Sequence, residues 1–176
     1  MQRIDLKVIL EDTASSGHGD LVTRPTGRAV RSGIEQALAD AQGERVAVID
    51  FGTVRCLDFS CADEIVGTLL REHGQAHYFL LHGVSAAHCE AIEHVLERHG
   101  LAVVARDREG RVRVLGQVPD RARREFSALT GSGLTSPEDI AGRMLAAAKR
   151  APSSPPTADR ARAGEKPGRS PTPAPE

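Results

Sequence analysis

The residues with the clearest chemical potential are a serine and three acidic residues around the start of a predicted helix. Ser60 follows Asp58 by two positions, and Asp63 and Glu64 come within the next four. A hydroxyl at a helix N-terminus lies beside backbone N–H groups that have no partner within the helix. A phosphate there would add about −1.5 to −2 charge at neutral pH, among three carboxylates. This pattern predicts a surface whose affinity for a partner changes on modification, without any catalytic group.

The same residues have a purely structural interpretation. Ser60 and Asp63 have nearly the spacing of a capping box, in which the serine oxygen accepts from a backbone N–H of the first helical turn. Asp50 and Asp58 can likewise serve as turn residues that bond nearby backbone N–H groups. A capping hydroxyl can also be a kinase substrate, so the structural and the regulatory interpretations both stay open.

Other patterns that could indicate an enzyme or a metal site fail on spacing. The three cysteines, Cys56, Cys61 and Cys89, include no Cys-x-x-Cys pair. His88, Cys89 and Glu90 are consecutive, and neighbouring helical residues do not face one another. No glycine-rich phosphate loop follows a predicted strand. We therefore expect no catalytic residue, no cofactor and no metal site.

Composition argues against several classes of binding protein. Lys and Arg total 23 and Asp and Glu total 24, so the net charge of −1 provides no electrostatic case for binding nucleic acid or an anionic membrane. Aromatic residues make up only 3%, too few for a base-stacking platform. The arginines of 106–113 and 121–124 alternate with acids, as on a solvated surface. We expect no nucleic-acid partner.

The location expected from sequence is cytoplasmic. No stretch approaches the roughly 20 apolar residues of a membrane span, and the first residues are too polar for a signal peptide. Three cysteines are too few for a disulfide framework and fit a reducing compartment. We therefore expect no membrane association.

Alternating strand and helix patterns surround these residues and predict an α/β domain with parallel strand pairs. Gly110 is expected in the turn of a hairpin formed by the last two strands. The predicted strands are 2–10, 45–51, 76–82, 101–105 and 111–115, and the predicted helices are 25–41, 61–73, 85–99, 119–129 and 136–150. The last helix has an apolar stripe that suits either the sheet or another chain.

Residues 50–61, DFGTVRCLDFSC, resemble the signature of STAS domains, the family of bacterial anti-sigma-factor antagonists and sulfate-transporter regulatory tails. The run aligns without a gap to the family pattern Asp-Leu-Ser-x-Val-x-Phe-Met-Asp-Ser-Ser-Gly, and the chain is most similar to the divergent STAS-like group of unknown function. The family's phosphorylatable serine falls on Ser60. Phe59 replaces the first serine of the family's pair, and Cys61 replaces the glycine.

The resemblance implies a STAS-like domain over 1–116, a small mixed sheet with helices mainly on one face. A C-terminal helical extension over 117–150 and a disordered, proline-rich tail over 151–176 would follow. The implied function is a non-enzymatic regulatory module, like an anti-sigma-factor antagonist, that is phosphorylated on Ser60. The implied partner is an anti-sigma factor or a histidine-kinase-like sensor. The expected partner-contacting residues are Asp50, Asp58, Phe59, Cys61, Asp63 and Glu64. An assembly or interaction domain without phosphorylation is the alternative, and the oligomeric state stays open.

Overall fold

The computed structural model describes residues 1–12, 19–41, 43–130 and 136–150. Five strands form one sheet in the order β1-β3-β5-β6-β7, in which all neighbours are parallel except β6 and β7. The strands are β1 (Gln2–Asp5), β3 (Val46–Asp50), β5 (Tyr78–Val84), β6 (Ala102–Asp107) and β7 (Val112–Gly116). The predicted α/β class with parallel pairs is therefore confirmed, whereas the STAS-like topology stays a prediction. The predicted tail, 151–176, lies outside the described residues.

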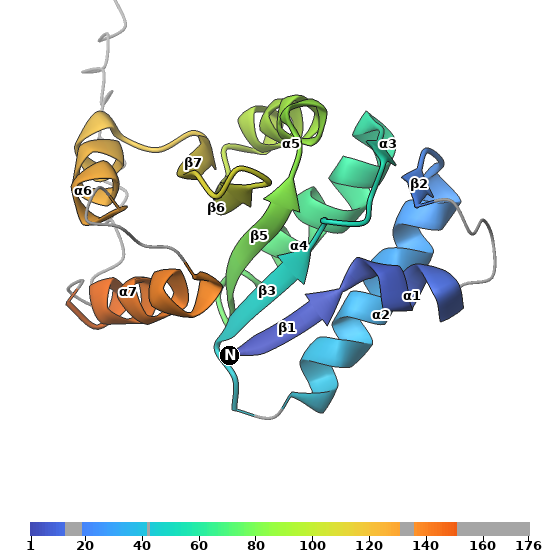
Figure 1. Cartoon of the computed structure of the whole chain (residues 1–176), viewed down its shortest axis with the longest axis horizontal. Helices are drawn as coiled ribbons and strands as arrows, with labels where there is room; N and C mark the ends of the chain where they lie inside the picture. Colours follow the sequence, from blue (N-terminus) through green and yellow to red (C-terminus); the bar gives the residue numbers. More distant parts are fainter. Residues whose placement is uncertain (13–18, 42, 131–135, 151–176) are drawn as a thin grey trace, which may run out of the picture.

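The helices that connect the parallel strands cover one face of the sheet (Figure 1). They are α2 (Arg24–Asp40), a continuous helical segment made of α3 (Phe59–Ala62), η1 (Asp63–Gly67) and α4 (Thr68–His73), and α5 (Ala86–His99). Crossovers between parallel strands are nearly always right-handed, so strands added in one direction across a sheet place their helices on the same side. Ile34, Ile65 and Ile92, one from each helical segment, are completely buried against this face.

The two C-terminal helices, α6 (Asp120–Thr130) and α7 (Pro137–Arg150), lie on the opposite side of the sheet (Figure 1). Ile140 of α7 is buried against Val48 of β3 and Leu80 of β5. The last helix, whose apolar residues suited either the sheet or another chain, therefore contacts the sheet through Ile140. It covers a face that the crossover helices leave open.

The predicted strand over 2–10 is wrong after its first half. β1 ends at Asp5, and a short helix, α1 (Leu6–Asp12), follows. The alternation of Ile4, Leu6 and Val8 suggested a strand, but Val8 is exposed. Leu6, Ile9 and Leu10 instead share the i, i+3, i+4 spacing of a helix and pack against the core.

Two smaller strand pairings complete the fold. A second, two-stranded sheet pairs β2 (Asp20–Leu21) with β4 (Cys56–Leu57), and it ties the segment before α2 to the loop before α3. The sequence analysis missed it because each strand has only two residues. The predicted hairpin of β6 and β7 is confirmed, with Gly110 at φ 88°.

The start of α5 contains a buried histidine that makes the fold sensitive to pH. Ser85 accepts from the His88 N–H at 3.2 Å, and the Ser85 N–H donates to His88 Nδ1 at 3.3 Å, which completes a capping box. Burial lowers the pKa of His88 from its usual value of 6.5, and the nearby Arg108 guanidinium acts in the same direction, against the effect of a backbone hydrogen bond at Arg55. The folded chain therefore favours neutral His88.

We predict that His88→Gln reduces the loss of stability on acidification. As pH falls below about 6.5, the unfolded chain takes up a proton that folded His88 resists, which costs at most about 1.4 kcal/mol by about pH 5.5. Glutamine keeps the capping box but does not titrate. Urea unfolding at about pH 7.5 and about pH 5.5 should show a smaller difference for the variant. His82, whose pKa burial also lowers, leaves part of the dependence in place. An unchanged difference would contradict the prediction.

Candidate functional site

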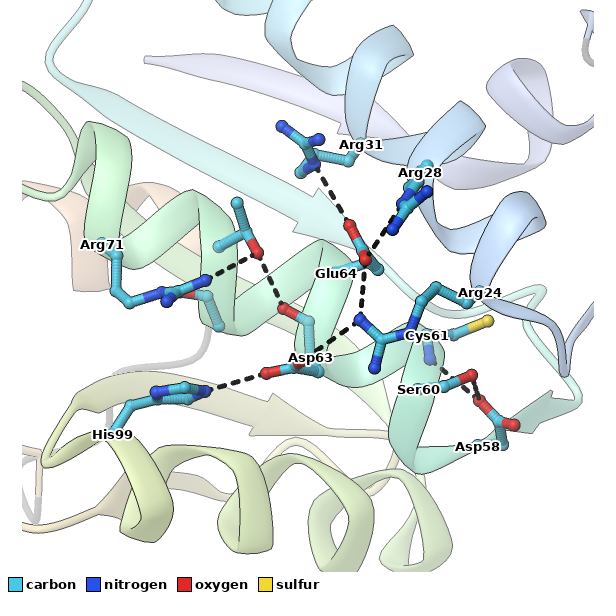
Figure 2. Close-up of polar contacts among 12 residues, drawn as sticks. Arg24, Arg28, Arg31, Asp58, Ser60, Cys61, Asp63, Glu64, Arg71 and His99 are labelled. Atoms are coloured by element: carbon cyan, nitrogen blue, oxygen red, sulfur yellow. Dashed lines mark hydrogen bonds and ion pairs between the residues drawn. The ribbon is translucent and has the colours of Figure 1, made fainter.

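The turn that begins α3 is organised by Asp58. Its backbone is extended, and its Oδ1 accepts from the Cys61 N–H at 2.8 Å and from the Ser60 hydroxyl at 2.9 Å (Figure 2). Asp58, not Ser60, is therefore the N-cap, and the capping-box interpretation of Ser60 and Asp63 is wrong. The physical reason is that the helix begins at Phe59, two residues earlier than the predicted Cys61, so Ser60 already lies in the first turn.

Ser60 itself is half-buried at this helix start. Its neighbours on either side anchor the turn to other helices. The Phe59 ring packs edge-on against His94 of α5, with 4.9 Å between ring centroids. The buried Cys61 thiol donates to the Thr23 carbonyl at 3.0 Å, at the start of α2. The position of the Ser60 hydroxyl is thus fixed from both sides.

Cys61 is not a nucleophile in this environment. Burial, together with the Asp58 carboxylate, raises the pKa of its thiol to about 11. Burial also raises the pKa of Cys89, although Arg113 Nη2 lies 2.9 Å from its sulfur. Both thiols are therefore protonated at neutral pH and lack the reactivity of a thiolate.

We expect alkylation to distinguish the three thiols. At about pH 8, iodoacetamide should modify the exposed Cys56 and leave Cys61 and Cys89 unmodified until urea unfolds the chain. Peptide mass mapping after a brief exposure measures the modified fraction at each site. Rapid modification of Cys61 in the folded chain would show that the α2–α3 contact is open in solution.

Asp63 and Glu64 are adjacent in the sequence and both lie near Arg24 of α2, but only Asp63 also contacts α5. Asp63 Oδ1 lies 2.8 Å from His99 Nε2 of α5, whereas Glu64 Oε1 accepts from Arg24 at 2.8 Å and from Arg28 at 3.2 Å, both on α2 (Figure 2). The backbone here forms a π-helical turn, η1, which inserts an extra residue and occurs often at functional sites.

The predicted acidic surface is wrong at two of its three acids, because Asp63 and Glu64 are covered, whereas Asp58 is half-buried. The Glu64 side chain is only 9% exposed and that of Asp63 16%, whereas Arg24 and Arg28 are 44% and 62% exposed. Burial would raise the pKa of Glu64, but hydrogen bonds from Arg24 and Arg28 hold it below its usual value. The pKa of Asp63 is likewise lowered, against burial, by His99. The Arg24 and Arg28 guanidinium groups are thus more exposed than the two carboxylates that they cover.

Asp50 does not join this network. It ends β3, where its Oδ1 accepts from the Gly52 N–H at 2.9 Å and its Oδ2 accepts from Arg3 at 2.6 Å. Burial would raise the pKa of Asp50, but the bond from Arg3 lowers it. Asp50 therefore makes the hydrogen bonds expected of a turn residue, which was the structural interpretation of this acid. Of the predicted partner-contacting residues, those within 58–64 form the candidate site, and Asp50 is not part of it.

Sequence analysis also missed the arginines that cover Glu64. Arg24, Arg28 and Arg31 lie at i, i+4 and i+7 in α2, so their shared helix face could have been recognised. Their partner, Glu64, is 33 to 40 positions away, and no local pattern indicates it.

A second group, Glu35, Glu72 and His73, brings ligand atoms within 4.8 Å of one another. The Arg31 guanidinium, however, already pairs with Glu35 at 2.7 Å and supplies the positive charge that a metal ion would otherwise provide.

Comparisons with other proteins add no identification. A scan against protein-family models finds no match, and neither do searches of curated proteins and of solved structures. Among the described residues, no helix has the length and apolar composition needed to cross a bilayer.

Proposed function

We propose that the chain is a regulatory module without enzymatic activity, similar to an anti-sigma-factor antagonist, which binds a protein partner through the turn 58–61 and the adjoining helices α2 and η1. The partner class is an anti-sigma factor or a histidine-kinase-like sensor, and phosphorylation of Ser60 controls the binding. The single observation that carries the proposal is the place of the Ser60 hydroxyl, half-buried in the first turn of α3.

The environment of Ser60 supports control by modification. The hydroxyl donates to Asp58 Oδ1, the same oxygen that caps the helix. A phosphate on Ser60 would remove this donor and place a second anion beside the Asp58 carboxylate. The repulsion disturbs the cap of α3, which Phe59 and Cys61 connect to α5 and α2. Modification of one hydroxyl therefore changes the surface shared by three helices.

The proposal is tested by phosphorylation in vitro. The full chain is incubated with ATP and an anti-sigma-type serine kinase, and intact mass spectrometry follows the addition of a phosphoryl group. We expect a gain on the wild type and none on Ser60→Ala. Ser127→Ala, which removes an exposed serine on α6, is the matched control and should be modified like the wild type. No gain on the wild type, or an undiminished gain on Ser60→Ala, would remove the phosphorylation step.

The alternative, an interaction domain without phosphorylation, is favoured by one specific contact. The 2.9 Å bond to Asp58 keeps the Ser60 hydroxyl occupied, and the carboxylate opposes an incoming phosphate. In that case the same surface binds its partner constitutively. The kinase assay separates the two functions, because the alternative predicts no mass gain while partner binding persists.

A further inference from the structure

A cavity lies between α6 and the face of the sheet that the crossover helices leave open (Figure 1). Its volume is about 340 Å³, within the range of about 300 to 1,000 Å³ that is usual for small-molecule sites. The sheet contributes Val104 and Val114, which pair across β6 and β7, and α6 contributes Ala122 and Phe126. The cavity is therefore bounded by two different elements, as small-molecule sites often are.

The cavity exists because α6 is held to the sheet edge by polar bonds while its apolar side chains are small. Arg123 donates through Nη1 to the Val114 carbonyl at 3.1 Å and through Nη2 to the Gly116 carbonyl at 2.9 Å. The facing positions Ala102 and Ala122 each supply only a methyl group. Well-packed interiors leave few voids larger than a water molecule, so the apolar surface left uncovered here can gain free energy by covering with a ligand.

One polar atom of the lining lacks a partner. The Nδ1 of His77 is buried, and within the described part of the chain it forms no hydrogen bond. The ring of His77 instead has an aromatic neighbour, Phe79, at 6.2 Å between ring centroids. A buried polar atom without a partner costs free energy, which a ligand recovers if it supplies the missing hydrogen bond. A hydroxyl is suited to this role in either imidazole tautomer, because it both donates and accepts.

The remaining lining defines the rest of the ligand. Among the described residues, none that lines the cavity is Asp, Glu, Lys or Arg. A charged ligand would lose hydration there without gaining a counter-charge, so the lining favours a neutral molecule. The rings of Tyr78, Phe79 and Phe126 favour an aromatic body, which gains edge-on or offset contacts beyond simple burial.

We infer that this cavity binds a small neutral phenol, whose ring lies between α6 and the sheet and whose hydroxyl bonds His77 Nδ1. The inference goes beyond the proposed function, because the cavity shares no lining residue with the turn 58–61, α2 or η1. It gives the chain a small-molecule site in addition to the partner surface at Ser60.

The test is an NMR titration of the full chain that follows the methyl signals of the lining valines. The probe is para-propylphenol, and the two controls are propylbenzene, which lacks the hydroxyl, and para-propylbenzoate, which is charged. We expect the phenol to shift the signals of Val104, Val114 and Val118 and to bind at least about fivefold more tightly than either control.

Three variants separate the hydrogen bond from the cavity itself. His77→Phe keeps an aromatic ring without the nitrogen, so it should weaken phenol binding about fivefold and leave propylbenzene binding unchanged. Ala122→Leu fills the cavity from α6 and should weaken binding of both molecules about tenfold or more. The matched control is Ala128→Leu, also exposed on α6 but outside the lining, which should bind like the wild type.

The inference is overturned if the phenol shifts signals elsewhere or none, or if either control molecule binds as tightly. It is also overturned if His77→Phe leaves phenol affinity unchanged, or if Ala122→Leu and Ala128→Leu bind equally. Nuclear Overhauser contacts between Val104 and residues 151–176 in the ligand-free chain would overturn it as well, because the chain's own tail would then fill the cavity. None of these results bears on phosphorylation of Ser60, so failure of the inference is distinguishable from failure of the proposed function.

Discussion

Glu64→Gln is expected to lower the free energy of unfolding by about 2 to 3 kcal/mol at neutral pH. The carboxylate is buried and accepts from Arg24 and Arg28, so a neutral amide leaves Arg28 without its counter-charge and leaves Arg24 only the more distant Asp63, at 3.5 Å. Loss of a fully buried partner costs more, but both arginines are over two fifths exposed, and solvent screens part of their repulsion. Urea unfolding of both proteins measures the difference.

The matched control is Glu72→Gln. Its carboxylate lies 3.6 Å from Arg31 but is 54% exposed, so the expected loss is below about 0.5 kcal/mol. Equal losses for the two variants would show that burial of Glu64 contributes nothing. The pH dependence gives a second check. Because the pKa of Glu64 is lowered in the folded chain, the wild-type advantage is complete above its usual pKa of 4.5 and disappears as pH falls through the folded value.

Gly83→Ala is expected to destabilise the chain by about 2 to 4 kcal/mol. Gly83 lies near the end of β5 with φ +69°, a conformation that costs alanine roughly 1 kcal/mol. A Cβ there would also lie 2.9 Å from both the Cα and the N of Gly52, so backbone must move. The moving segment follows β3 and leads to the turn at Asp58, so the variant disturbs the site as well as the fold.

Gly100→Ala separates the two contributions to this loss. Gly100 ends α5 with φ +63°, close to that of Gly83, but a Cβ there meets no atom within 4 Å. It should therefore cost only the conformational part, about 1 kcal/mol. Thermal or urea unfolding of the two variants compares them directly. A loss for Gly83→Ala no greater than that for Gly100→Ala would show that the Gly52 contact is not tight in solution.

The parts of the fold that follow from local chemistry could be predicted from sequence. Helix α5 is the clearest case. The predicted helix 85–99 agrees with the observed Ala86–His99 to within one residue, because Ser85 caps its start and Gly100 ends it, both residue types typical of these positions. The strand over 2–10 failed because its first apolar residues fit a strand and a helix equally well. Only tertiary packing of Leu6, Ile9 and Leu10 on the core decides between them.

The site was only partly predictable for a related reason. The concentration of function-capable residues in 58–64 is a local feature and could be recognised. The covering of Glu64 is not local, because it depends on Arg24 and Arg28, which the fold brings to Glu64 from 36 to 40 positions away. The identity of the cap also required the structure, since Asp58 and Ser60 are both good N-cap residues.

The most direct test of the partner surface is photo-crosslinking in cells of the source organism. A benzoylphenylalanine is placed at position 59, beside Ser60, or at position 127 on α6 as the control. We predict an adduct with a protein from position 59 and not from 127, and loss of that adduct when Ser60→Asp adds a negative charge. An adduct from position 59 that is unaffected by Ser60→Asp, or adducts from position 127 alone, would contradict a partner surface controlled at Ser60.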